Sequence, residues 1–432
     1  MPLWLTKEEV WQLHNLIKTY NELTEEKKRI ANRHARATYI LCENNHLIKL
    51  TQEKTATKTL QVPRRRKKLK DVPDRCPLCG GKIVEVIDME PRIDVKEILD
   101  GFDRWCEKIE RQAFSMIEDH PVYKNWLCKV KGLGKINSAR LIYLLETQRD
   151  LSKSSKLMAR TGAYFVAVCE KCRVYYARNV PPPPQKVLCP ICGNEMYRTI
   201  PGKWLVYYKP LDWKPQILAK RSEVTGRYPI PYDPRMRDII YKSVTGIYGY
   251  TWRFALPKFV KNNEEGIVPW YGVWVLYKMA VAYQRYSAEK RRRPFLSALS
   301  AGVYSCAKVL LTHLWLVAMC LKYPDNMEEW WRRRLPKSVM EQGHQGTVPF
   351  VDVPVPAMDE LYSKIVPDKY KYLIEHTYSD LTKMLKYVVE QYKEKKIQKL
   401  VKGAEQERAQ AQKQELERLG LEEEGEGEEA GE

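Results

Sequence analysis

Apolar residues recur three or four positions apart along most of this chain, which predicts a mostly α-helical fold. Thr6 and Glu9 form a capping box, and Leu13 and Ile17 follow on one face of the helix that it begins. The same spacing predicts a second helix over residues 24–41. Further helices are expected over 91–118, 152–160, 231–241, 270–286 and 295–321, and one long helix begins near 373.

The most apolar stretch, 295–321, is long enough to span a bilayer. Lys308 and His313 lie inside it, and a lysine in the middle of a membrane span is costly. We therefore expect a buried core helix here and no membrane association. The chain opens on Met1-Pro-Leu-Trp and continues into a charged helix rather than a secretory signal, so a cytoplasmic protein is expected.

Residues 122–164 contain two short apolar-striped segments joined by a Gly-Leu-Gly turn, which predicts a helix-hairpin-helix. Such a turn needs positive φ and close backbone approach, which a Cβ would obstruct. The first N–H groups of the second helix then point outward at the positive end of its dipole, where a phosphate can bind. The alternative is an ordinary helix pair with a tight corner. The residues expected at the phosphate are Lys131, Gly132, Gly134, Lys135 and Arg140.

Two Cys-x-x-Cys pairs follow closely, Cys169 with Cys172 and Cys189 with Cys192. This separation is typical of a zinc ribbon, in which four thiolates close a structural Zn²⁺ site between short strands. A redox dithiol is the alternative. The chain has 11 cysteines, and their pairing favours metal ligation in a reducing compartment over disulfides.

A further pair, Cys76 and Cys79, has the sequence of a zinc knuckle, which needs two more ligands to close a tetrahedral site. Cys42 and His46 are four residues apart on the expected preceding helix, so they could face one metal together. Cys106 is another candidate ligand, and a second chain could also complete the site. We expect a second Zn²⁺ here.

The formal net charge is +20, and the glutamate-rich end of the chain makes the remainder more positive still. A soluble cation of this size usually has a polyanion partner, most often nucleic acid. An anionic membrane surface and a generically basic protein are the alternatives. The further basic positions expected to contact phosphate are Arg64, Arg65, Arg66, Lys67 and Lys68 in a linker, and Arg235 and Arg237 near the start of a helix.

Four segments occur in a characteristic order: Lys-Val-Lys-Gly-Leu-Gly-Lys-Ile-Asn-Ser-Ala-Arg-Leu-Ile at 129–142, a turn at 155–162, Tyr-Asp-Pro-Arg-Met-Arg-Asp-Ile-Ile-Tyr at 232–241, and a helix at 301–315 with Ala-Lys and Leu-Trp pairs. This order resembles the C-terminal half of the DEDD-type insertion-sequence transposases, which use a structured guide RNA. The resemblance extends over 92–325, interrupted by the ribbon.

The resemblance implies a RuvC-like nuclease half with four acidic metal ligands, and residues 1–90 show no βαβ pattern that could supply it. It also implies a nucleophilic serine after the hairpin unit, an interval that the ribbon occupies here. Ser222 is the one candidate for that serine, just upstream of the Arg-x-Arg helix.

We therefore predict a mostly α protein in which a helix-hairpin-helix domain carries an inserted small β zinc ribbon and a second zinc knuckle. Its expected function is to bind DNA through phosphate contacts, without catalysis by this chain alone. An active recombinase, using Ser222 or a partner's acidic residues, and a structured-RNA-binding protein are the alternatives. A homo-oligomer or a partner protein could use the C-terminal helix.

The predicted regions are N-terminal helices (1–60), a basic linker with the knuckle (61–90), the helix-hairpin-helix domain (91–165), the ribbon (166–200), a transposase-like helical domain (201–325), a Pro-rich linker (326–372), and a long helix with a disordered acidic tail (373–432).

Overall fold

The computed structural model describes residues 3–33, 37–44, 46–50, 75–76, 79–89, 95–177, 185–199, 201, 203–211, 228, 230–262, 268–289, 293–334 and 371–418. These residues are mostly helical, as predicted, with two small sheets. The chain divides into two compact units. The first contains Met1–Trp11 and Phe114–Glu432, and the second contains Gln12–Ala113.

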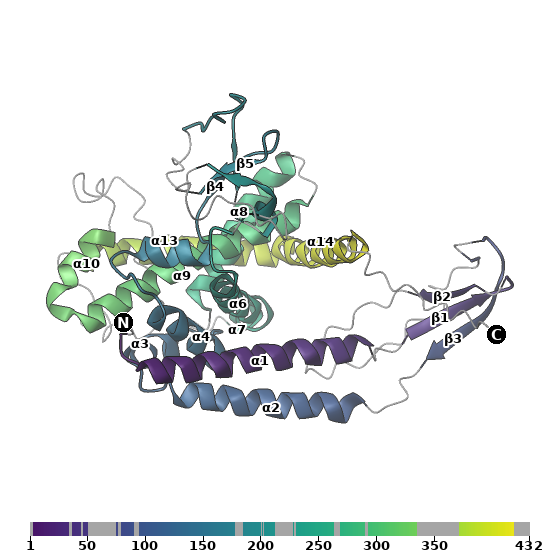
Figure 1. Cartoon of the computed structure of the whole chain (residues 1–432), viewed down its shortest axis with the longest axis horizontal. Helices are drawn as coiled ribbons and strands as arrows, with labels where there is room; N and C mark the ends of the chain where they lie inside the picture. Colours follow the sequence, from purple (N-terminus) through teal and green to yellow (C-terminus); the bar gives the residue numbers. More distant parts are fainter. Residues whose placement is uncertain are drawn as a thin grey trace. The chain divides into compact units, whose positions relative to one another are not determined.

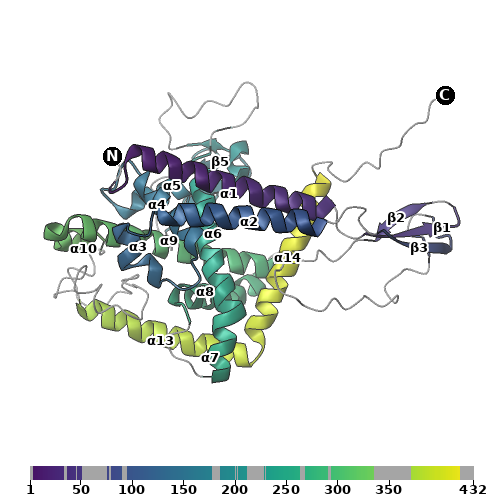
Figure 2. The same cartoon turned by 90° about the horizontal axis from the view of Figure 1, so that it is seen from below.

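Two helices, α1 (Lys7–Arg33) and α2 (Val95–Ser115), run side by side along most of the second unit (Figures 1 and 2). They are antiparallel. Lys27 of α1 forms an ion pair with Asp103 of α2, whereas Thr24, which comes earlier in α1, contacts Cys106, which comes later in α2. The predicted capping box begins α1, with the Thr6 hydroxyl accepting from the Glu9 N–H at 3.2 Å. That helix then continues to Arg33 without a break.

No second helix begins near residue 24, because residues 24–33 continue α1, and the prediction of a helix as far as 41 is wrong. The chain instead forms β1 (Ala37–Cys42), β2 (Leu47–Leu50) and β3 (Ile83–Met89), an antiparallel sheet in the order β2-β1-β3. The segment Thr-Tyr-Ile within β1 is β-branched and aromatic, and such residues favour strands. The segment is too short for the spacing of its apolar residues to distinguish a helix from a strand. The sheet connects the end of α1 to the start of α2.

In the first unit, helices gather around α9 (Pro294–Lys322), which is in contact with α8 (Trp270–Ala288) along much of its length. This helix is long and apolar enough to cross a bilayer, but 89% of its most apolar window is buried inside the protein. The predicted core helix is therefore confirmed. The other helices that contact α9 are α3 (Pro121–Asn125), α4 (Lys135–Glu146), α5 (Ser154–Thr161), α6 (Pro234–Tyr250), α10 (Met327–Arg334) and α14 (Lys396–Arg418).

The C-terminal region forms two helices, α13 (Lys371–Lys393) and α14, rather than the one long helix predicted. The break lies at residues 394–395, where Lys395 has a φ of 59°. Buried residues of both helices, including Val388, Ile397 and Val401, join the apolar core formed with α8 and α9. This apolar face is therefore in contact with the chain's own helices. The predicted acidic tail lies outside the described residues.

The ribbon sheet has the order β6-β4-β5-β7 and inserts between α5 and α6. Its strands are β4 (Val166–Cys169), β5 (Val174–Tyr176), β6 (Tyr197–Thr199) and β7 (Lys209–Pro210). The remaining elements of the unit are η2 (Leu127–Lys129), η3 (Lys203–Tyr207), a π-helical turn η4 (Thr251–Ala255), α7 (Leu256–Asn262) and η5 (Pro324–Asn326).

A buried polar cluster fixes the start of the chain to α3 and α4. Glu146, at the end of α4, accepts hydrogen bonds from the backbone N–H groups of Leu3 and Trp4. Its other neighbour is the His120 ring, with 2.9 Å between Oε1 and Nε2. Because His120 Nδ1 accepts from the Val122 N–H, the proton of the neutral ring is on Nε2 and is donated to Glu146. The side chains of Glu146 and His120 are fully buried.

The α8–α9 contact depends on Gly302. A Cβ at this position would lie 2.5 Å from the carbonyl oxygen of Val275, so an alanine would force two backbones apart. We expect Gly302→Ala to lower the free energy of unfolding by about 1–3 kcal/mol, as overpacking usually does. The control is Gly249→Ala on α6, where an added Cβ meets nothing within 4 Å. That change should be neutral or stabilising by up to about 1 kcal/mol in urea denaturation.

Candidate metal centres and nucleic-acid interface

The ribbon brings together the four predicted ligands, Cys169, Cys172, Cys189 and Cys192. Their sulfur atoms all lie within 4.8 Å of one another, and Cys169 Sγ is 3.6 Å from Cys192 Sγ. Cys169 ends β4, Cys172 lies in the turn to β5, and the second pair precedes β6. Such a four-sulfur set has the tetrahedral chemistry of a closed structural site, so this cluster could hold a metal ion such as zinc.

The knuckle backbone positions the sulfurs. Gly193 follows the second pair with φ of 70°, and its N–H donates to the Cys189 carbonyl at 2.9 Å. The equivalent residue after the first pair is Arg173, which takes the same left-handed conformation at φ of 52° without being glycine. Both turns therefore have a left-handed residue after the second cysteine, and only glycine adopts this conformation without strain. Their hydrogen bonds differ, since the Arg173 N–H donates to the Glu170 carbonyl at 3.3 Å.

Proton distribution among the four thiols is uneven. Burial opposes ionisation of Cys189, but backbone N–H groups of Cys192 and Ile191 and the neighbouring thiols outweigh it and lower the pKa of Cys189 to about 7. The hydrogen bond with Cys192, followed by burial, raises the pKa of Cys172 to about 12. A metal ion that binds here would therefore displace protons from the thiols and release them to solvent.

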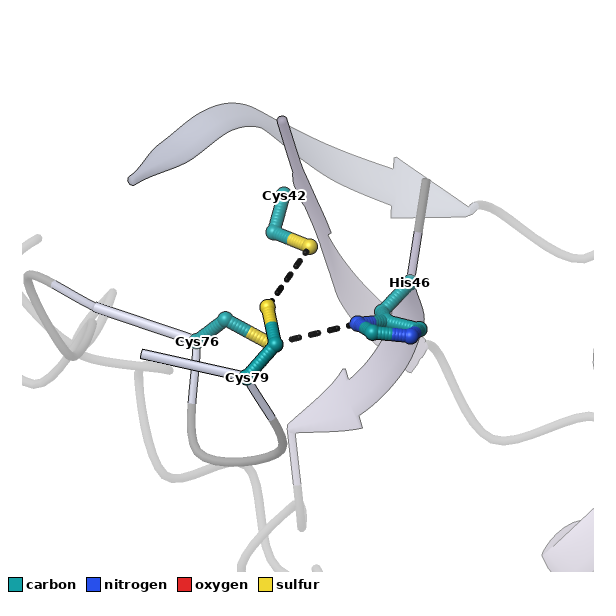
Figure 3. Close-up of side chains that lie close together, drawn as sticks. All are labelled: Cys42, His46, Cys76 and Cys79. Atoms are coloured by element: carbon teal, nitrogen blue, oxygen red, sulfur yellow. Dashed lines mark hydrogen bonds between the residues drawn. The ribbon is translucent and has the colours of Figure 1, made fainter. Parts of the chain in front are cut away.

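A second cluster contains Cys42, His46, Cys76 and Cys79 (Figure 3), the set that the sequence suggested for the knuckle. Cys42 Sγ is 3.7 Å from Cys79 Sγ, and Cys76 Sγ is 3.9 Å from His46 Nδ1. The expected reason was wrong, because Cys42 and His46 do not share a helix. Cys42 ends β1 and His46 precedes β2, so a hairpin turn brings them together.

The three-sulfur, one-nitrogen donor set of this second cluster also fits a closed tetrahedral metal site. Cys106 does not belong to it, since its thiol lies beside Thr24. The knuckle glycine has the same role as in the ribbon: Gly80, with φ of 73°, donates its N–H to the Cys76 carbonyl at 2.8 Å. This cluster could likewise hold a metal ion such as zinc.

Sequence reasoning missed Asn44, which contacts the second cluster. Its side-chain amide donates to Cys79 Sγ at 3.3 Å. This hydrogen bond, with a smaller contribution from the Gly81 backbone, lowers the pKa of the exposed Cys79 thiol to about 6. The available signal was an asparagine between the two candidate ligands Cys42 and His46. It indicates a contact with the cluster only if this segment is taken as the turn of a hairpin.

The turn before α4 contains both glycines of the predicted hairpin in left-handed backbone, with φ of 83° at Gly132 and 70° at Gly134. A Cβ at Gly132 would lie 2.8 Å from Tyr250 Cβ, so this glycine allows the turn to approach α6. At Gly134 an added Cβ meets nothing within 4 Å. Gly134 is also the N-cap of α4 and provides no side-chain cap. The two glycines therefore have different roles, one in packing and one at an open helix end.

The predicted basic residues are placed differently from one another. Lys131 and Lys135 are exposed beside Gly134, and the Lys135 ammonium lies 4.5 Å over the Phe114 ring. Arg140 was expected at the surface and is instead 5% exposed, with its guanidinium donating to Asn137 Oδ1 at 2.8 Å. Most residues of α4 are buried, and Arg140 is among them. We therefore remove Arg140 from the candidate interface.

Asp233 caps α6, accepting from the Arg235 N–H at 2.9 Å, with Pro234 in the first turn. Arg235 is exposed. Arg237 is half-buried, and its guanidinium carbon lies 4.8 Å from the Tyr232 ring centroid. The remaining predicted site residues lie outside the described residues: Arg64, Arg65, Arg66, Lys67, Lys68 and Ser222.

Comparison with known proteins gives no relative from which to transfer a function. No family model matches this chain, and neither does any curated protein or solved structure. The function proposed below therefore depends on the geometry and charge of the chain's own residues.

Proposed function

We propose that this chain is a zinc-containing protein that binds nucleic acid, duplex DNA foremost, through phosphate contacts. The observation that carries the proposal is at the N-terminus of α4. Gly134, the N-cap residue, gives this helix no side-chain cap, and it lies between the exposed Lys131 and Lys135 in sequence. The positive end of the helix dipole and two ammonium groups favour a phosphate at this position. Such contacts carry no base sequence information.

The local geometry supports the proposal that α3, the following turn and α4 form a helix-hairpin-helix. Gly132 brings the turn against α6, so the phosphate-facing segment is held by the helical core. The net charge of +20 supports a polyanion partner independently of this turn. DNA is proposed ahead of RNA because a helix-hairpin-helix contacts duplex backbone without needing splayed bases.

We propose Zn²⁺ as the metal of both clusters. Thiolate and imidazole donors in tetrahedral sets are the ligands that Zn²⁺ prefers, and four protein ligands leave no open position for catalysis. The metals would then have a structural role, each closing a small sheet. Recombinase activity stays a prediction that depends on the resemblance and on Ser222, so we limit the proposal to binding.

Reversing two charges at the turn tests the proposal. We expect Lys131→Glu with Lys135→Glu to weaken duplex binding at least about tenfold and to reduce the salt dependence by about two units, because two phosphate contacts are lost. The loss should be equal for duplexes of unrelated sequence, measured by fluorescence anisotropy.

The matched control is Lys399→Glu with Lys402→Glu, which reverses the same number of exposed charges on α14. Equal losses in the two double variants would show a general charge effect and contradict a site at the turn. Tighter binding of structured RNA than of duplex DNA by the wild-type protein would favour the RNA-binding alternative.

A further inference from the structure

Lys308 on α9 is a half-buried cation surrounded by aromatic rings. Its ammonium lies 4.4 Å from the centroid of the Phe165 ring and 4.8 Å from that of Tyr304. Among the described residues no carboxylate forms an ion pair with it. Burial lowers the pKa of Lys308 to about 8, with no other contributor. A desolvated cation without a counter-ion is unfavourable, and an anionic ligand would remove that cost.

Phe165, between α5 and β4, offers an open aromatic surface beside this cation. Its ring is tilted against Tyr304 at a centroid distance of 5.3 Å. Despite these two contacts, Phe165 remains 45% exposed. The part of the ring that neither Lys308 nor Tyr304 covers faces solvent, so a planar apolar group could stack there.

Two tyrosine hydroxyls nearby are buried and have no hydrogen-bond partner, those of Tyr304 and Tyr241. Tyr304 is only 3% exposed. Burial raises the pKa of Tyr304. The Tyr304 ring centroid lies 4.8 Å from the Lys308 ammonium, and the Tyr241 ring centroid lies 4.9 Å from the guanidinium carbon of Arg237. Buried polar groups in folded proteins almost always have partners, so these two hydroxyls could each donate to an acceptor that a ligand supplies.

We propose that Phe165 and Lys308 form a site for one unpaired nucleotide, whose base stacks on the open part of the Phe165 ring and whose phosphate pairs with the Lys308 ammonium. The proposal rests on the proposed nucleic-acid binding and assigns it a substrate class, DNA or RNA with an unpaired end or loop. Aromatic stacking combined with a cation is how proteins hold single-stranded nucleic acid without reading its sequence.

The test compares a blunt duplex with the same duplex carrying a short single-stranded tail that contains 2-aminopurine. The full-length protein should bind the tailed duplex more tightly and quench the 2-aminopurine fluorescence. Phe165→Ala should abolish the quenching and reduce the affinity for the tailed duplex about tenfold, the range expected for loss of one stacked base. Affinity for the blunt duplex should not change. Lys308→Met should also remove the advantage of the tail.

Lys278→Met is the matched control. Lys278 on α8 also lies over an aromatic ring, 4.5 Å from the centroid of Trp274, and burial also lowers its pKa. Trp274 is only 4% exposed, however, and the second ring near Lys278, that of the half-buried Tyr277, lies farther away at 5.6 Å and packs edge-on against Tyr387. The control variant should keep the wild-type preference for the tailed duplex. Thermal melts would confirm that each variant is folded.

Tight binding of the blunt duplex with no gain from the tail, or a gain that survives Phe165→Ala, would overturn this inference alone. Failure of the wild-type protein to bind either duplex would overturn the proposed function as well. Parallel tails of DNA and RNA separate the two sources of an unpaired nucleotide, and stacking on Phe165 in either one supports the site.

Discussion

Replacing Cys189 with serine is expected to remove one zinc ion per chain and to unfold the ribbon. The buried cluster on the metal side of its sheet is small, with Ala167, Val174 and Met196 as its fully apolar members. So few side chains cannot hold three-residue strands together by burial alone. Structural zinc in small domains contributes about 10–16 kcal/mol of binding free energy that is also folding free energy.

Elemental analysis should count two zinc ions per wild-type chain and one in Cys189→Ser. Limited proteolysis should then cut this variant within 166–199 while the helical core stays protected. The control is Cys128→Ser, an exposed thiol outside both clusters, which should keep both ions. Cys42→Ser should lose the other ion and leave the ribbon resistant. Two ions in Cys189→Ser, or none in the wild type, would contradict the metal assignment.

Glu146→Ala is expected to lower the free energy of unfolding by about 3 kcal/mol, because each buried donor left without an acceptor costs about 1–3 kcal/mol. The carboxylate accepts hydrogen bonds from Leu3, Trp4 and His120. An alanine would leave the buried His120 ring N–H and the half-buried N–H groups of Leu3 and Trp4 without this acceptor. A carboxylate at a helix C-terminus is disfavoured by the dipole, so its presence in α4 makes sense only because of these donors.

Urea denaturation followed by circular dichroism would measure the change. Glu118→Ala, at an exposed position near the same cluster in sequence, should change stability by less than about 0.5 kcal/mol. A variant lacking residues 1–5 should lose part of the same stability, because it removes two of the three donors. Near-wild-type stability of Glu146→Ala would show that the cluster does not hold the N-terminal segment in place.

The ribbon ligands and the α9 core helix could be predicted from sequence because both signals are local. Cys-x-x-Cys pairs close over a few residues, and α9 has apolar residues on all its faces. Prediction of the second cluster succeeded only in part. Cys42 and His46 were predicted as ligands from helical spacing, whereas the turn between β1 and β2 brings them together. The prediction named the right residues because a helix and a hairpin turn can both bring residues four apart within reach of one metal.

Other features depend on contacts that no local pattern contains. Glu146 and Leu3 lie far apart in sequence, so their hydrogen bond has no local signature. Arg140 seemed a surface cation because basic residues surround it, yet it is one of the many buried residues of α4. Phe165 follows a Gly-Ala-Tyr turn and looks like an ordinary core residue. Only the fold shows its ring beside Lys308 and open to solvent.

The salt dependence of duplex binding by the zinc-loaded, full-length protein tests the central claim most directly. We expect the logarithm of affinity to fall linearly with the logarithm of salt concentration, by about 0.9 units for each phosphate contacted, and equally for duplexes of unrelated sequence. No binding in dilute buffer, or an affinity that salt does not change, would contradict a protein that holds nucleic acid through its phosphates.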